Sequence, residues 1–179
     1  VAHLNYGNAL EGVAPRRQQI GHFEHAVELG PRDANAHYHL GRALALGSDL
    51  ERGVEHYKIS LALDAEQPKA WNNLGSALGK LGDVELASAA YRRALELGPG
   101  HATSNFNLAM ARLREGDTGS ALEFAQRYAQ TSWPPADHEA NVEALARAFA
   151  RVGDIGGACE LIGLSSSTSG SLQALLGGL

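Results

Sequence analysis

Side chains that hydrogen-bond in two directions recur in this sequence every 34 residues. The series is Asn5, His39, Asn73 and Asn107. An asparagine amide offers both a donor and an acceptor, so it pairs with the main chain of an extended peptide without selecting a side chain. The spacing therefore favours peptide recognition. The alternative is that these side chains hydrogen-bond only to neighbouring helices.

The other reactive side chains do not assemble a catalytic or metal site. His22 and His25 are three residues apart, which lets two side chains on one helix share an ion, but no carboxylate or cysteine cluster completes a coordination shell. The serines lack a Gly-x-Ser-x-Gly elbow, and the glycines do not form a phosphate-binding loop. The sequence therefore predicts a protein that is not an enzyme and has no metal or cofactor.

Composition narrows the class of protein. With 44% hydrophobic residues, the 179-residue chain is too apolar to be disordered. A net charge of −5 argues against nucleic acid as a partner, because phosphate neutralisation needs clustered basic residues. The single Cys159 excludes an internal disulfide. No apolar run approaches the roughly 18 residues of a membrane helix, so we expect no direct membrane insertion.

The first residue and the composition suggest where the chain comes from. Because it begins with Val1, we expect a processed chain or a fragment of a longer protein. A cytoplasmic location is expected, with the periplasm or a larger complex as alternatives. The richness in alanine, glycine and arginine favours a bacterial source.

The 34-residue period extends to two further kinds of residue. Glycine recurs at Gly7, Gly41 and Gly75, and alanine follows at Ala109. An aromatic series (Phe23, Tyr57, Tyr91) and a series at the ends of segments (Pro31, Ala65, Pro99) have the same period. Three series with one period indicate an array of small units rather than a single globular domain.

Each unit is predicted to contain two helices. Residues 69–81 place apolar or small side chains on one helical stripe, namely Trp71, Leu74, Gly75 and Leu78. Gly82 ends this helix in the left-handed conformation, and Asp83 caps a second helix over residues 84–97. Because β-type alternation is absent, the sequence predicts an all-α fold.

Small and large residues have separate tasks in this scheme. Gly75 and Ala87 are expected to let the two helices of a unit approach closely. Trp71 and Tyr91 are expected to fill the space between successive pairs.

The motif Trp71-x-x-Leu74-Gly75-x-x-Leu78, followed by Ala87-x-x-x-Tyr91, Ala94 and Pro99, resembles the tetratricopeptide repeat. The resemblance covers about residues 1–133 as four units, and a fifth, degenerate unit fits after a short insertion. It implies a right-handed α-solenoid of stacked helix-turn-helix units. The expected units are 1–33, 34–67, 68–101, 102–135 and 139–163, followed by a Ser-rich linker and a short helix or tail over 164–179.

The family's first helices line a concave groove, so the resemblance also implies a set of partner-binding residues. These are Asn5, Asn8, Tyr38, His39, Arg42, Lys69, Asn72, Asn73, Phe106, Asn107, Met110 and Arg114. Arg42, Lys69 and Arg114 favour an acidic segment or a C-terminal carboxylate, and Phe106 and Met110 would add an apolar patch.

One subset of the family binds the C-terminal carboxylate of heat-shock chaperones through a five-residue clamp. Only Asn8 and Lys69 match that clamp, whereas Leu4, His39 and Asn73 replace its other members. The sequence therefore argues against this particular ligand.

The repeat pattern also implies positions for the remaining histidines and the cysteine. His22 and His25 are expected on the solvated side of a second helix. His3 and His37 occupy the packing position of Trp71, and Cys159 is expected to be a small packing residue in the last helix pair.

We therefore predict a non-catalytic scaffold that binds an extended or acidic segment of a partner protein in its groove. Two alternatives stay open. The first is that the array is the recognition arm of a larger glycosyltransferase or sulfotransferase. The second is that it is a structural subunit of a complex or homo-oligomer, bound through its outer face or ends. Leu4, Tyr6 and Leu10 begin a unit with no preceding helix, so we expect either that residues are missing there or that another chain covers them.

Overall fold

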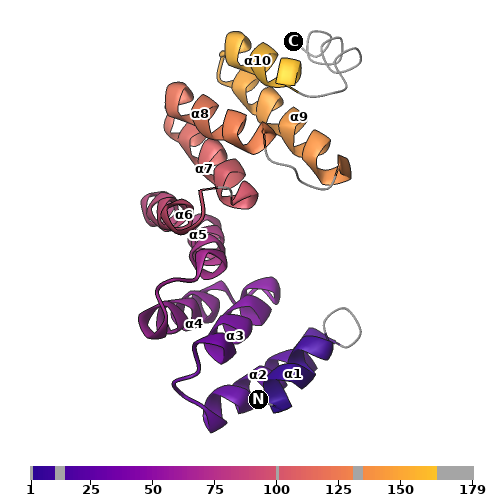
Figure 1. Cartoon of the computed structure of the whole chain (residues 1–179), viewed down its shortest axis with the longest axis vertical. Helices are drawn as coiled ribbons and strands as arrows, with labels where there is room; N and C mark the ends of the chain where they lie inside the picture. Colours follow the sequence, from indigo (N-terminus) through magenta and orange to yellow (C-terminus); the bar gives the residue numbers. More distant parts are fainter. Residues whose placement is uncertain (1, 11–14, 100, 131–134, 165–179) are drawn as a thin grey trace. The chain divides into compact units, whose positions relative to one another are not determined.

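Every regular element in the part of the chain that the computed structural model describes, residues 2–10, 15–99, 101–130 and 135–164, is an α-helix (Figure 1). The helices are α1 (Ala2–Ala9), α2 (Arg16–Leu29), α3 (Ala34–Leu46), α4 (Leu50–Leu63), α5 (Pro68–Leu81), α6 (Val84–Leu97), α7 (Ala102–Glu115), α8 (Thr118–Ala129), α9 (Pro135–Arg151) and α10 (Ile155–Leu164). The prediction of an all-α fold is confirmed. The Ser-rich tail after residue 164 lies outside the described residues.

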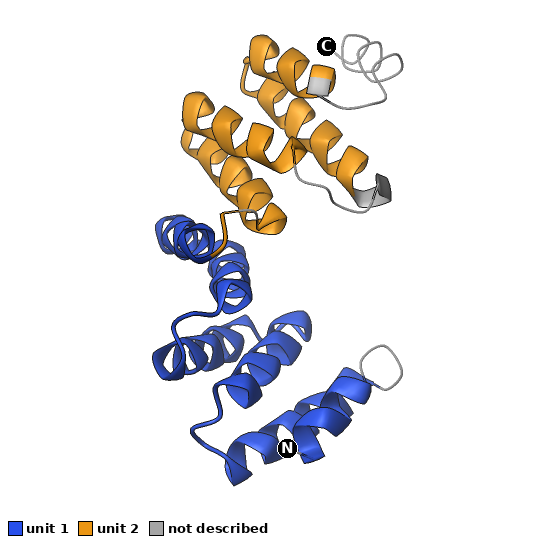
Figure 2. Cartoon of the chain, in the orientation of Figure 1, with its two compact units in different colours: residues 1–97 blue, residues 98–179 orange. Residues whose placement is uncertain are grey.

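The helices form consecutive hairpins within two compact units, Val1–Leu97 and Gly98–Leu179 (Figure 2). In the first unit α1 pairs with α2, α3 with α4, and α5 with α6, and each hairpin stacks on the next through α2–α3 and α4–α5 contacts. In the second unit the α7–α8 hairpin packs on the α9–α10 hairpin. Each unit is thus a stack of helix hairpins, the arrangement of an α-solenoid.

A glycine facing an aromatic ring sets the close approach of the two helices in each of the first three hairpins. A methyl group at Gly75 would lie 2.7 Å from Cε1 of Tyr91 and 3.0 Å from the carbonyl oxygen of Ala87. The same substitution at Gly7 would meet Phe23 at 2.5 Å, and at Gly41 it would meet Tyr57 at 3.1 Å. The close approach predicted at Gly75 and Ala87 is confirmed, and Gly7 and Gly41 have the same role in their hairpins.

The fourth hairpin solves the same packing problem with two alanines. Ala109 takes the position of Gly75, and Ala125 takes that of Tyr91, one period later in each case. Both alanines are fully buried. The methyl group that Ala109 adds therefore has room, because Ala125 has no aromatic ring to occupy that space.

The turns between paired helices use a left-handed residue followed by aspartate. Gly82, Gly116 and Gly153 have φ values of 94°, 80° and 86°. In the second hairpin the corresponding residue is Ser48, with φ of 72°. A residue with a Cβ atom is strained in this region by roughly 1–2 kcal/mol.

Replacing Ser48 with glycine is therefore expected to raise the free energy of unfolding by a net amount of up to about 1 kcal/mol. This is the strain relieved less the cost of the greater flexibility of glycine in the unfolded state. The urea unfolding midpoint measures the change. Ser76→Gly, in the middle of α5, is the matched control and is expected to lower the midpoint, because glycine is a poor helix former. A lower midpoint for Ser48→Gly would contradict the assignment of strain.

Aspartates cap several of the helices. The Asp33 carboxylate accepts hydrogen bonds from the backbone N–H groups of Asn35 and Ala36, and Asp154 accepts one from Gly157 at 2.8 Å. Asp117 accepts one from Ser120, and this hydrogen bonding lowers the pKa of the Asp117 carboxyl. Each carboxylate satisfies N–H groups that have no partner inside the helix.

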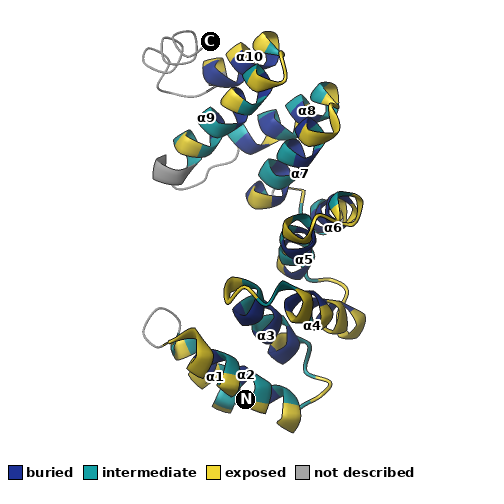
Figure 3. Ribbon diagram, turned by 180° about the vertical axis from the view of Figure 1, so that it is seen from behind, coloured by how far each residue is buried: buried dark blue, intermediate teal, exposed yellow. Residues whose placement is uncertain are grey.

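Buried residues lie between the helices, and exposed residues lie on their outer surfaces (Figure 3). In the second unit the core includes Leu145, Phe149 and Leu161. The expectation that Cys159 is a packing residue is wrong, because its side chain is exposed. Ala158 and Leu161 take the buried face of α10, and Cys159 is turned about 100° away from Ala158.

Candidate functional site

The first helices of the hairpins form one face of the first unit. The backbones of α1 and α3, and of α3 and α5, lie close together, whereas those of α2, α4 and α6 do not approach one another in the described residues of this unit. A stack bends toward the side on which its helices are closest. We call the surface of α1, α3 and α5 the inner face of the first unit.

A polar contact joins two successive hairpins at the centre of this face. The Asn73 amide nitrogen donates to the Tyr38 hydroxyl at 3.3 Å. Both side chains are half-buried. Because Tyr38 accepts this bond, its own O–H proton is left to donate to another acceptor.

Burial affects the titration of the two tyrosines at this position. It raises the pKa of the Tyr38 hydroxyl, with a smaller opposing effect from the hydrogen bond with Asn73. Burial likewise raises the pKa of Tyr57, whose ring lies 6.2 Å from that of Tyr38. Both phenols therefore stay protonated near neutral pH, so that each is a donor rather than an anion.

His39 follows Tyr38 on α3, and Arg42 lies about one helical turn after Tyr38. The His39 ring stacks on Phe23, with 5.6 Å between ring centres, and burial lowers the pKa of the imidazole despite the opposing charge of Asp33. His39, Arg42 and Arg16 line a hollow of only about 10 Å³. This hollow is too small for a partner side chain, so binding here would use the surface of the inner face.

The remaining candidates of the first unit differ in exposure. Asn5 and Lys69 are exposed, and Asn8 is half-buried. The structure places Asn72 otherwise than expected, because its side chain is only 6% exposed and donates to Oδ1 of Asn73 at 3.4 Å. Asn72 therefore orients its neighbour instead of lining the surface.

In the second unit the four candidates lie on α7. Phe106 and Met110 are half-buried and pack against the core of that unit, and the Phe106 ring lies 5.5 Å from that of Tyr128. Asn107 is half-buried, and Arg114 is exposed. The predicted apolar patch is thus largely part of the core packing.

The histidines pair across the helices of the first two hairpins. His37 is 4% exposed, as expected for a packing residue, and its Nδ1 lies 3.0 Å from Nδ1 of His56. His3 and His22 approach in the same way, with 3.5 Å between their Nδ1 atoms.

The expectation that His22 is solvated is wrong. Its ring is half-buried against His3 and Tyr6, because these side chains of α1 cover it, whereas His25 is exposed. No group of three or more histidine, cysteine or acidic side chains is arranged to hold a metal ion in the described ranges.

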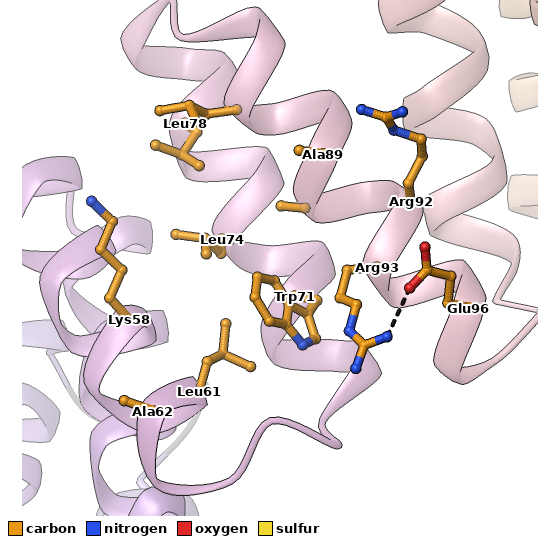
Figure 4. A pocket seen from close by; sticks show the side chains of 12 residues that line it. Lys58, Leu61, Ala62, Trp71, Leu74, Leu78, Ala89, Arg92, Arg93 and Glu96 are labelled. Carbon is orange, nitrogen blue, oxygen red and sulfur yellow. Dashed lines mark hydrogen bonds and ion pairs between the residues drawn. The ribbon is translucent and has the colours of Figure 1, made fainter.

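Sequence reasoning missed a large apolar cavity on the opposite side of α5. The cavity, which we call the outer cavity, has a volume of about 780 Å³. It is lined by Lys58, Leu61, Ala62, Trp71, Leu74, Leu78, Leu86, Ala89, Ala90, Arg92, Arg93 and Glu96 (Figure 4). The expectation that Trp71 and Tyr91 fill the space between successive pairs is therefore wrong. The half-buried ring of Trp71 leaves this space open, and Tyr91 packs against Gly75 within its own hairpin. A comparison of residues 34 positions apart would have shown that side-chain contacts of the preceding hairpin are missing at this cavity.

The repeat pattern has a counterpart among known families. The family model described as the tetratricopeptide repeat matches residues 20–69 and 72–137, which together are more than half of the chain. This chain belongs to the tetratricopeptide repeat family.

Several solved structures share the fold. The TPR protein YrrB, whose structure is described as having an unusual peptide-binding site, is 20% identical, with a TM-score of 0.77 over 99% of this chain and 90% of that one. PilF of Pseudomonas aeruginosa is 20% identical, with a TM-score of 0.76 over 94% of this chain and 76% of that one. MamA is 17% identical, with a TM-score of 0.76 over 96% and 95%. A search of curated proteins found no match.

Tetratricopeptide repeat proteins are generally non-catalytic scaffolds for protein–protein interaction and bind protein or peptide partners. In the described residues, no helix is both long enough and apolar enough to cross a membrane.

Proposed function

We propose that the chain is a non-catalytic scaffold that binds an extended, acidic segment of a partner protein on the inner face of the first unit. The observation that supports this most directly is the half-buried contact between Asn73 and Tyr38. It fixes a neutral hydroxyl donor where two successive first helices meet. Fixed donors lower the entropy cost of binding, because fewer side chains become ordered when the ligand arrives.

The charges around this contact select the ligand. Arg42 lies on α3 and Lys69 on α5, so cations from both hairpins accompany the Tyr38 hydroxyl. Carboxylates would accept charge-assisted hydrogen bonds from the cations and a hydrogen bond from the phenol. Asn5 and Asn8 extend the polar surface along α1 and suit peptide groups rather than particular side chains.

The test is selection from a library of random octapeptides, followed by titration of enriched peptides by fluorescence anisotropy. We expect enrichment of aspartate and glutamate. Arg42→Gln/Lys69→Gln is expected to weaken binding roughly a hundredfold or more, because it removes two charge-assisted hydrogen bonds that contribute about 1.5–3 kcal/mol each. Tyr38→Phe is expected to weaken it roughly tenfold, because a hydrogen bond to an ionised carboxylate contributes about 1.5 kcal/mol or more.

The matched control is Arg147→Gln/Arg151→Gln, which removes two exposed positive charges from α9 and is expected to leave the affinity unchanged. An equal loss in this control would show that net charge, rather than the inner face, governs binding. Enrichment of neutral or basic peptides would overturn the acidic ligand.

A further inference from the structure

The outer cavity lies on the side of α5 opposite to the inner face. Successive helical residues are turned by about 100°, which puts Trp71, Leu74 and Leu78 on one side of α5 and Asn73 on the other. The cavity is bounded by α4 and α6, and Figure 4 shows Trp71, Leu74 and Leu78 in a row between Lys58 and Arg92. Its volume of about 780 Å³ is that of a site which receives several large side chains.

The preceding hairpin layer has side-chain contacts at the positions that line the outer cavity one period later. Between α2 and α4, the Arg52 guanidinium forms an ion pair with Glu24 at 2.8 Å. Between α3 and α4, His37 and His56 stack with 5.2 Å between ring centres. These contacts tie α2, α3 and α4 together.

Each of these contacts is lost one period later. Lys58 replaces Glu24 and Leu86 replaces Arg52, so the ion pair cannot form. Ala90 replaces His56, so Trp71 has no ring to stack on at that position. Leu86 is left 55% exposed at the edge of the cavity. The sequence of this hairpin therefore removes both contacts that the preceding layer makes at these positions.

The charges at the cavity rim are predominantly positive. Lys58 and Arg92 pair with no carboxylate in the part of the chain that the structure describes, whereas Arg93 forms an ion pair with Glu96 at 2.7 Å (Figure 4). Three cations and one carboxylate line this cavity, although the chain as a whole has a net charge of −5. Lys58 comes from α4 and Arg92 from α6, so the two unpaired cations stand on opposite walls.

We propose that the outer cavity is a second docking site, which binds an acidic amphipathic helix of a partner protein. An apolar floor between two cationic walls matches a helix whose apolar stripe is flanked by carboxylates on both sides. Large apolar side chains of that helix enter over Trp71, Leu74 and Leu86, and its carboxylates meet Lys58 and Arg92. The site is separate from the inner face, so one chain holds two partner segments at once.

A peptide selection on the intact chain tests this proposal. The probe is a displayed library of 18-residue peptides with a helix-forming framework and random residues at all solvent-facing and apolar positions. We expect the enriched peptides to combine large apolar residues at i, i+3/i+4 and i+7 with flanking acidic residues. Their affinities are measured by titration against the wild-type chain.

Two variants test the open apolar cavity and its positive charges separately. Lys58→Glu/Leu86→Arg restores the residues that form the closing ion pair in the preceding layer, and it is expected to weaken binding at least thirtyfold. Lys58→Gln/Arg92→Gln keeps the cavity open and is expected to weaken acidic peptides roughly tenfold while leaving peptides with glutamine in place of glutamate unaffected. Thermal unfolding of both variants confirms that they fold.

The matched control is Arg147→Gln/Arg151→Gln, which removes two exposed positive charges from α9 and is expected to leave these affinities unchanged. Enrichment of helices without acidic residues, or binding that Lys58→Glu/Leu86→Arg does not weaken, would overturn the proposal. Self-association of the wild-type chain that this variant abolishes would also overturn it, because a second copy would then be the occupant. The octapeptide selection depends on Arg42 and Lys69 and fails or succeeds independently.

Discussion

Replacing Gly75 with alanine is expected to destabilise the first unit by about 1–3 kcal/mol, the usual effect of adding a methyl group to a well-packed core. The added methyl would lie 2.7 Å from the Tyr91 ring and 3.0 Å from the Ala87 carbonyl oxygen. The ring has somewhere to move only if α5 and α6 separate, because Tyr91 is itself buried. The measurement is the urea unfolding midpoint of the variant against the wild-type chain.

A double-mutant cycle makes this prediction specific to the glycine–ring contact. Tyr91→Ala alone is expected to destabilise by about 3–5 kcal/mol, because it leaves a cavity. Gly75→Ala/Tyr91→Ala copies the Ala109 and Ala125 pair of the fourth hairpin. The double variant should therefore be more stable than the sum of the single effects by about 1 kcal/mol or more. Strict additivity would contradict the compensation.

The second large effect is expected with pH. The thermal unfolding midpoint of the wild-type chain should fall by several degrees between pH 7.5 and pH 5.5. Burial, together with the charges of His37 and Arg52, lowers the pKa of His56 in the folded chain, against the opposing effects of Glu55 and Glu24. Burial also lowers the pKa of His39, against the opposing charge of Asp33.

The sign of this pH effect comes from proton binding. The unfolded histidine titrates near 6.5, so below that pH the unfolded chain binds protons that the folded chain does not. The stabilisation from the neutral imidazoles is therefore complete above pH 6.5. It is lost as the pH falls from there toward the lower pKa values of the folded chain.

The third hairpin supplies the variant that tests the cause. His37→Trp/His56→Ala copies Trp71 and Ala90, which occupy the same repeat positions. It is expected to reduce the slope of the unfolding midpoint with pH, whereas Ser48→Gly changes the midpoint and keeps the slope. An unchanged slope in His37→Trp/His56→Ala would show that the His37–His56 pair is not the source.

The fold follows from the sequence because each hairpin is specified by residues close together in the chain. The close approach at Gly75, the ring of Tyr91 and the left-handed Gly82 all lie within one period, so a periodic pattern is enough to predict them. The same reasoning misplaced Cys159, because the last hairpin departs from the pattern and gives its buried positions to Ala158 and Leu161.

The candidate sites were harder to predict because they depend on side chains from different hairpins. The contact between Tyr38 and Asn73 joins helices of two successive hairpins, and no local pattern states that their side chains meet. The outer cavity lies where Lys58, Leu86 and Ala90 replace Glu24, Arg52 and His56, so the ion pair and the ring stack of the preceding layer are missing. A comparison of the two layers shows these replacements, whereas a search for residues shared by every repeat passes over them.

The Gly75–Tyr91 and Ala109–Ala125 pairs also bear on how such a chain can be rearranged by duplication and recombination. A crossover that joined α5 to α8 would face Gly75 with Ala125 and leave a void, whereas one that joined α7 to α6 would drive Ala109 into Tyr91. A crossover that falls between hairpins keeps each matched pair together. The unit that such an array can gain, lose or exchange is therefore the whole hairpin, and a single helix is not interchangeable with its counterpart one period away.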